Sequence, residues 1–292
     1  MKPENFTEFL IRQGHRIVKT ESCFWYDAQI GFFFQFPYHK LVSPSKAELE
    51  VLFKNTPCFG TRYFTPWNNI GKESYLIVCS DKNYDFTSTD ANYARRQTRR
   101  GVENFDIKQI DFKYLADNGI KIVHETLARQ CRDLRIWTEK NWRLYCTSAD
   151  GIDGFEAWGA FKENTLAAFI IGFQCYDCFN ILHHSSSTEY LKQYINNALV
   201  YSLTKLKLAD NDIAQISYGP ESLDAPESLD KFKFRMGYQK FPMKQRIIFN
   251  PLIKPFINTY SYKIVQKLSE IKPESDTLRK ADGIIRFYLE AK

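Results

Sequence analysis

One stretch of the chain, residues 179–250, limits the possible folds more than any other feature. It begins with a strand-like alternation over 179–184 and passes through the hydroxyl cluster Ser185–Thr188. A helical pattern follows from Leu191, with the positions expected on one face being Ile195, Ala198, Leu199, Ser202 and Leu206. Because Ser and Thr are favoured N-cap residues, we expect the cluster to cap this helix and to make its start an anion site.

The second part of the same stretch repeats the change from strand to helix. Residues 213–218 alternate again and stop at the turn signal Gly219-Pro220. Residues 227–236 then predict a short helix that ends at Gly237. Strands that lead into helices, the first of them with one apolar face, predict helices that pack along a sheet.

Two segments resemble a known superfamily. The run Ser228–Tyr238, a short basic helix that closes on Met-Gly before an aromatic strand, is similar to the ending of many GNAT domains, the fold of acyl-CoA-dependent acyltransferases. The run Asn92–Gly101 is similar to the Lys/Arg-rich helix between the two halves of Fem-type aminoacyltransferases, which are tandem GNAT folds. The resemblance covers about residues 15–250.

The resemblance implies a fold class and a domain organisation. We expect an α/β (α+β) protein with a GNAT-like mixed, mainly antiparallel sheet flanked by helices, built from two tandem halves. Residues 1–112 would form a degenerate N-terminal half, 113–250 the C-terminal GNAT-like domain and 251–292 a helical extension. The apolar stripe of that extension, from Leu252 to Leu268, suits packing on its own chain or on a second subunit.

The periodicity of the remaining chain predicts the other elements. Helices are expected at 4–13, 46–54, 89–103, 114–131, 138–147 and 278–289, with a further helix beginning near Pro251. Strands are expected at 16–19, 23–26, 30–36, 58–64, 75–79, 106–111, 155–161, 165–174 and 179–184, the last three as an antiparallel meander.

Composition limits the classes of function. Forty Lys and Arg against 34 Asp and Glu give a mild, dispersed positive charge that does not by itself identify a nucleic-acid binder. Residues 1–15 mix charges with apolar residues and predict no secretory signal, and the run 165–176 is too short to span a membrane. Seven Cys without a framework spacing fit a reducing compartment, so we expect a cytoplasmic protein without disulfides.

The expected donor site follows from the resemblance. In GNAT enzymes, the pyrophosphate of acetyl-CoA or another acyl-CoA is held by backbone N–H groups at the start of the helix that follows the fourth strand. Ser185, Ser186, Ser187 and Thr188 occupy that place here, although no Gly is present and Glu189 opposes an anion; the alternative is an ordinary helix cap. Lys231, on the basic edge of the last helix, is a further candidate for donor phosphate, or part of a solvated face.

Three residues are candidates for the chemistry of acyl transfer, which needs a base for the amine and an acid for the leaving group. His183 is the preferred base, with His184 expected to face the other way; the alternative is a hydrogen-bonded structural histidine. Tyr218, at the end of the following strand, is the candidate acid, and its alternative role is to cover the core. Glu156 is the carboxylate alternative, or a surface residue.

Two further clusters have open interpretations. The first is a group of arginines within one helical turn of one another: Arg95, Arg96, Arg99 and Arg100. We expect Arg95, Arg96 and Arg99 to bind an anionic substrate, such as phosphate, a nucleotide-activated sugar or tRNA. The alternative is that they pair with Asp90, Glu103 and solvent. The Cys-x-x-Cys at 175–178 lies in a turn between strands and lacks the ligand set of a zinc site, so no metal is expected.

The sequence leaves three functions open. The first is an N-acyltransferase that moves an acyl group from acyl-CoA to an amine of a small molecule or of a cell-envelope precursor. The second is Fem-like aminoacyl transfer from aminoacyl-tRNA, with tRNA the less favoured partner, and the third is a noncatalytic GNAT-fold binding module. The acceptor, the acyl length and the oligomeric state do not follow from the sequence.

Overall fold

The computed structural model describes residues 1–29, 31–223 and 228–291, which form two compact units. The described part of unit 1 comprises 1–9, 77–219 and 228–240, and that of unit 2 comprises 10–76, 220–223 and 241–291. The chain passes from one unit to the other within α1 (Pro3–Arg12), β5 (Lys72–Cys79), β10 (Gln215–Pro220) and β11 (Gln239–Phe249). The predicted boundaries at 112 and 250 concern tandem halves and stay a prediction.

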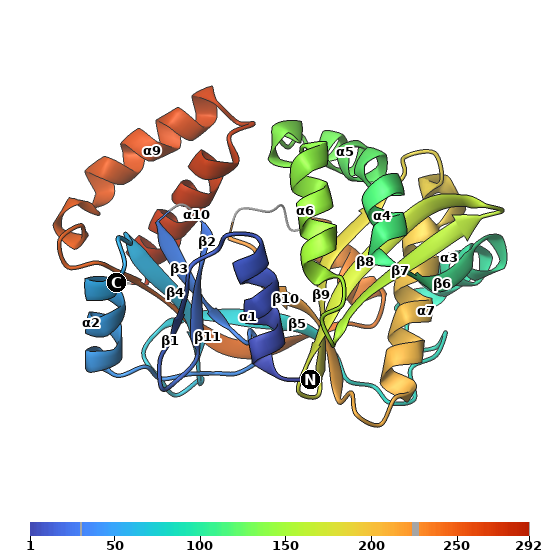
Figure 1. Cartoon of the computed structure of the whole chain (residues 1–292), viewed down its shortest axis with the longest axis horizontal. Coiled ribbons are helices and arrows are strands. Elements are labelled where there is room, and N and C mark those ends of the chain that lie inside the picture. Colours follow the sequence, from blue (N-terminus) through green and yellow to red (C-terminus); the bar gives the residue numbers. More distant parts are fainter. Residues whose placement is uncertain (30, 224–227, 292) are drawn as a thin grey trace. The chain divides into compact units, whose positions relative to one another are not determined.

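Unit 1 is a mixed sheet with helices on its faces (Figure 1). Its strands are β6 (Asp106–Ile110), β7 (Phe155–Lys162), β8 (Thr165–Cys175), β9 (Cys178–Ser186) and β10 (Gln215–Pro220). Its helices are α3 (Ala91–Asn104), α4 (Phe112–Asn118), α5 (Ile120–Arg129), α6 (Glu139–Ala149), α7 (Ile195–Ala209) and α8 (Ser228–Arg235), with 3-10 turns η1 (Leu134–Ile136) and η2 (Leu191–Gln193).

The strands of unit 1 follow the order β10-β9-β8-β7-β6. The pairs β6/β7, β7/β8 and β8/β9 are antiparallel, and β9/β10 is parallel. The parallel pair requires a crossover, and α7 supplies it while packing on β7, β8 and β9. The meander predicted for 155–184 is confirmed.

Unit 2 has the strands β1 (Ile17–Lys19), β2 (Phe24–Gln29), β3 (Phe32–Phe36) and β4 (Gly60–Thr65), which continue in the order β1-β2-β3-β4-β11. Here β3/β4 is the parallel pair, and its crossover is α2 (Lys46–Asn55), which begins with a capping box between Ser45 and Glu48. The unit ends with η3 (Lys254–Phe256), α9 (Thr259–Ile271) and α10 (Asp276–Glu290).

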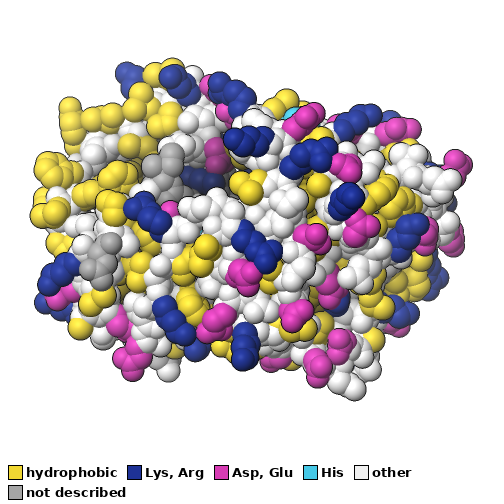
Figure 2. Space-filling view, in the orientation of Figure 1, with side chains coloured by type: hydrophobic (Ala, Val, Ile, Leu, Met, Phe, Trp, Pro, Cys, Tyr) yellow, Lys and Arg dark blue, Asp and Glu magenta, His cyan; other side chains and the backbone are white. Residues whose placement is uncertain are grey.

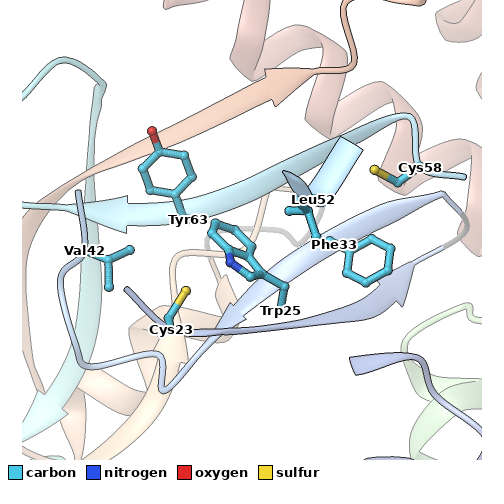
Figure 3. Packing of buried hydrophobic residues seen from close by; sticks show 7 residues of the cluster. All are labelled: Cys23, Trp25, Phe33, Val42, Leu52, Cys58 and Tyr63. Carbon is cyan, nitrogen blue, oxygen red and sulfur yellow. The ribbon is translucent and has the colours of Figure 1, made fainter. Parts of the chain in front are cut away.

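A cluster of aromatic and aliphatic side chains forms one core of unit 2 (Figure 3). Trp25 from β2, Phe33 from β3 and Tyr63 from β4 are fully buried, and Leu52 from α2 closes the cluster from the helix side. Trp25 also donates its indole N–H to Thr20 Oγ1 at 3.0 Å, so its burial leaves no polar atom unpaired. Because side chains alternate between the two faces of a strand, these residues form one apolar face of the sheet, and α2 packs on that face.

The predicted fold class, a mainly antiparallel mixed sheet flanked by helices, is confirmed, but several boundaries are wrong. The helix expected over 114–131 is two helices, because the chain bends at Gly119, where a Cβ would lie 2.8 Å from Leu115 O. The helix expected over 89–103 is α3, at Ala91–Asn104. The extension expected to begin as a helix near Pro251 has a 3-10 turn first, and its α-helix starts at Thr259.

Candidate functional site

The strands β9 and β10 pair at three positions and then separate. The paired residues are Cys178 with Gln215, Phe179 with Ile216 and Asn180 with Ser217. Beyond this point β9 continues to Ser186 beside β8, and β10 continues to Pro220, with no further pairing of the two strands among these described residues. The edge of β9 after Asn180 therefore has backbone groups that β10 does not satisfy.

A β-bulge at Leu182 determines which of the two histidines, His183 or His184, lies on the face of the sheet that α7 covers. His183 pairs with Ile171, and Ile181 pairs with Gly172. Since Ile171 and Gly172 are consecutive and face opposite sides, Ile181 and His183 do so as well. The regular alternation predicted over 179–184 is therefore wrong at His183.

His184 lies next to Tyr218, at the point where the two strands have separated. Its Nδ1 is 3.3 Å from the Tyr218 hydroxyl, and Nζ of Lys233 lies 5.4 Å from the centre of the Tyr218 ring. Burial lowers the pKa of His184 to about 4, and the charges of Lys233 and Arg129 act in the same direction. Burial raises the pKa of Tyr218. At neutral pH the pair is an uncharged imidazole beside a protonated phenol.

His183 is packed among aromatic rings on the other face of the sheet. The rings of Trp137, Trp142, Tyr145 and Phe169 have their centres within 5.5 to 6.1 Å of the imidazole. Its Nε2 makes a 2.9 Å hydrogen bond with the Ser185 hydroxyl, and burial lowers its pKa to about 4. These contacts are those of a structural histidine.

The hydroxyl cluster Ser185–Thr188 does not cap a helix. Ser185 and Ser186 are the last residues of β9, and α7 begins at Ile195 with Tyr194 as its N-cap and no side-chain cap bond. The expected cap position is wrong because the strand runs two residues further than its alternation indicates and a 3-10 turn intervenes.

The same cluster is bound to α5. Ser186 N–H donates to Thr126 Oγ1 at 3.0 Å, and Thr188 N–H donates to Glu125 Oε2 at 2.7 Å. Arg129 donates to the Ser186 carbonyl at 2.8 Å, and the Ser187 hydroxyl donates to Glu125. These backbone N–H groups are already occupied, so the cluster holds α5 against the end of β9.

The start of α7 has N–H groups that take no part in the hydrogen bonds of the helix. Tyr194 adopts a left-handed conformation with φ 65°, and the first intrahelical bond runs from Ala198 N–H to its carbonyl. The N–H groups of residues 195–197 therefore have no partner within the helix and point from its positive end. Gly101 of α3 packs directly on this turn, since a Cβ there would lie 2.6 Å from Tyr194 O.

The other two catalytic and donor candidates lie apart from the His184–Tyr218 pair. Glu156 accepts from Lys207 Nζ at 2.6 Å and from Trp158 Nε1 at 2.7 Å. Lys207 is in the last turn of α7, about 16 Å along the helix from its first turn. Lys231 is an exposed residue of α8, whereas Lys233, two residues later, reaches Tyr218.

The arginine group divides between two faces of α3. Arg95 is half-buried and donates to the Phe86 carbonyl at 3.0 Å, which is a structural contact. Arg96, Arg99 and Arg100 are exposed, with exposed Tyr93 close by in sequence. Because Ala94, Thr98 and Gly101 face inward, this exposed group lies on the side of α3 away from α7.

No cluster of three or more His, Cys, Asp and Glu that could hold a metal ion is present over 1–29, 31–223 and 228–291. Cys175 and Cys178 face each other across the β8–β9 turn, and both are buried. Among the same residues, no helix combines the length and the apolar composition that crossing a bilayer requires.

Comparison with known proteins agrees with this geometry. No protein-family model and no curated protein matches the sequence. The structure matches FemX with a TM-score of 0.57 at 9% identity, over 86% of this chain and 92% of that one. It also matches L-PGS from Bacillus licheniformis, with a TM-score of 0.52 at 11% identity, over 85% of this chain and 92% of that chain.

A third match is the C-terminal DUF2156 domain of a protein assigned as a lysylphosphatidylglycerol synthetase in Agrobacterium fabrum. Its TM-score is 0.55 at 8% identity, over 83% of this chain and 87% of that domain. The chain has a GNAT-like fold. At such identities the likeness establishes the Fem-like, GNAT-like architecture and does not carry residue roles.

Several contacts of the site join residues that lie far apart in the sequence, so the sequence alone does not predict them. Three elements bring Lys233 and Asn196 to His184. The strand end at Ser186 is held by Glu125 and Arg129 of α5, which lie about sixty residues earlier in the chain. Gly172 is the one local signal of the bulge, because a Cβ there would lie 2.2 Å from the Phe179 ring.

Proposed function

We propose that the chain is a GNAT-type N-acyltransferase whose reaction takes place beside His184 and Tyr218. The observation that carries the proposal is the separation of β9 from β10 after Asn180, with a hydrogen-bonded imidazole and phenol on the separated ends. An extended donor with amide groups, such as the pantetheine arm of acyl-CoA, can pair with the free edge of β9 as a strand would.

In the proposed reaction, an amine attacks the thioester carbonyl, loses one proton, and displaces a thiolate that gains one. His184 is uncharged at neutral pH, since its pKa is about 4, and it accepts the proton of the attacking amine. The Tyr218 hydroxyl keeps its proton because burial raises its pKa, and it protonates the leaving thiolate. His183 is assigned to packing in place of its predicted role as base.

The proposed donor site is the first turn of α7. Its free N–H groups and positive end suit a pyrophosphate, as at many helix starts. In this proposal the Ser185–Thr188 cluster has an indirect role, because its bonds to α5 fix the end of β9. Lys233, instead of Lys231, is the lysine of α8 that binds donor phosphate. The acceptor is an amine of a small molecule or of a cell-envelope precursor.

The second candidate is aminoacyl transfer from aminoacyl-tRNA. The observation that favours it is the exposed face of α3, where Arg96, Arg99 and Arg100 lie near Tyr93, while the opposite face of α3 packs on the start of α7. Such a basic face, on the side of α3 opposite to the proposed donor site, suits a polyanion larger than CoA.

The test is calorimetric titration with CoA, acetyl-CoA and an aminoacyl-tRNA, followed by an acetyl-transfer assay with a panel of amines. We expect micromolar binding of acetyl-CoA and transfer that falls by about a hundredfold or more in Tyr218→Phe and in His184→Gln. Tyr176→Phe, on an exposed turn residue, is the matched control and should retain full activity.

Each other outcome has a definite meaning. Binding of aminoacyl-tRNA without CoA, lost in an Arg96→Glu/Arg100→Glu variant, would replace acyl-CoA by the second candidate. Binding without transfer, unchanged in Tyr218→Phe and His184→Gln, would indicate a noncatalytic module. No binding of either donor would refute both transferase proposals.

A further inference from the structure

Helix α9 of unit 2 has two apolar faces, and one of them is fully explained by packing. Tyr262 and Val265 contact the cluster that includes Ile284, Ile285 and Phe287. The helix begins with a capping box in which Asn258 and Ser261 bond to each other's backbone. The fold of unit 2 therefore uses the inner face of α9 and does not need an apolar outer face.

The outer face of α9 nevertheless carries large hydrophobic side chains. Tyr260, Ile264 and Leu268 are spaced by four residues and are 76%, 49% and 44% exposed, and Ile271 is 64% exposed. The segment before the helix adds Leu252 at 81% and Phe256 at 71%. Scattered hydrophobic residues are normal on a protein surface, but a continuous stripe of this kind marks an interaction surface.

Basic residues border this stripe. Lys263 and Lys267 lie on one side of it and Lys272 on the other, and all three are exposed, as is Lys254 in η3. The exposed acidic residues of the same segment are Glu270 and Glu274. Figure 2 shows hydrophobic side chains gathered over the region of α9 with Lys and Arg side chains beside them.

The charges select the partner. In a symmetric contact between two copies, the stripe of one copy would meet the stripe of the other, and two borders with an excess of lysine over glutamate, each of net positive charge, would face each other. An anionic lipid surface has the opposite complement, because it offers acyl chains to the apolar side chains and negative headgroups to the lysines. We propose that the outer face of α9 docks this protein on the surface of an anionic membrane.

The proposed docking places the helix in the plane of the interface. Tyr260, Ile264, Leu268 and Ile271 enter the boundary between headgroups and acyl chains, and the flanking lysines remain at headgroup level. No part of the chain has to cross the bilayer for this contact. The proposal does not depend on the activity of unit 1, so it stands or falls separately from the proposed function.

The test is co-sedimentation of the purified full chain with phosphatidylcholine vesicles that contain or lack phosphatidylserine. We expect binding to the anionic vesicles, which weakens with salt and is at least about tenfold weaker without phosphatidylserine. Ile264→Asp should weaken binding by about tenfold or more, because a charge replaces an inserted side chain. Ile70→Asp, at an exposed isoleucine elsewhere in unit 2, should bind as the unchanged chain does.

A charge variant and a size measurement complete the test. Lys263→Glu/Lys267→Glu should lose binding, whereas the matched pair Lys46→Glu/Lys54→Glu on α2 should keep it. Absence of vesicle binding, or equal losses in the test and control variants, would overturn the proposal. Light scattering gives a second outcome that would overturn it: a dimer that Ile264→Asp dissociates, with vesicle binding by neither protein. The stripe would then bind a second copy of the chain.

Discussion

At the scale of single residues, Glu156 shows how a side chain suited to catalysis can serve structure. It lies half-buried on β7 with Lys207 Nζ at 2.6 Å and the Trp158 indole N–H at 2.7 Å. Lys207 in turn lies over the rings of Trp158 and Phe179, at 5.6 and 4.8 Å. The carboxylate thus joins the sheet to the last turn of α7.

This arrangement predicts a strong asymmetry between single and double variants. Lys207→Met should destabilise the protein by about 2 to 3 kcal/mol, because it leaves a partly buried carboxylate without its cation. Adding Glu156→Gln should restore about half of that loss or more. Urea unfolding of the four proteins of the double-mutant cycle measures the coupling, and additive losses would show that the ion pair is not the link.

At the scale of elements, the junction of α3 with the start of α7 leaves no room for a side chain at Gly101. Gly101 lies in mid-helix, where glycine normally weakens a helix by about 1 kcal/mol relative to alanine. Its absence of a side chain is needed here, since a Cβ would lie 2.6 Å from Tyr194 O and 3.2 Å from Ala198 Cβ. Tyr194 is also the residue that starts α7.

We therefore expect Gly101→Ala to reverse the usual sign of this substitution. Instead of gaining about 1 kcal/mol, the protein should lose about 1 to 3 kcal/mol, because α3 must move away from α7. Arg100→Ala, on the outer face of the same helix, should change the stability little. Thermal unfolding of both variants decides the matter, and a stabilised Gly101→Ala would mean that the two helices adjust to the added methyl group without cost.

At the scale of the whole molecule, the sequence predicts elements better than it predicts contacts. The order of strands and helices and the meander over β7–β9 follow from local periodicity, and the structure confirms them. The bulge at Leu182 depends on register against β8, where Gly172 admits the Phe179 ring. One shifted residue was enough to turn His183 to the opposite face from Ile181. The clamp of α5 on Ser186 likewise joins residues about sixty positions apart.

The two histidines also predict how the stability of the whole protein depends on pH. The pKa values of His183 and His184 are lowered from 6.5 to about 4 in the folded chain, chiefly by burial. Below pH 6.5 the unfolded chain binds protons that the folded chain does not, so the stabilisation is complete above pH 6.5 and is lost as the pH falls to about 4. Each histidine can account for at most about 3 kcal/mol of this loss.

His183→Gln isolates one of these contributions, because glutamine fits the site, can bond to Ser185, and does not titrate. The variant should be less stable than the unchanged chain at about pH 7.5, but its free energy of unfolding should fall by about 2 kcal/mol less on going to about pH 4.5. Tyr176→Phe, at an exposed turn residue, is the control and should follow the unchanged chain. Urea unfolding at the two pH values measures the difference, and equal losses in all three proteins would place the acid sensitivity in the carboxylates instead.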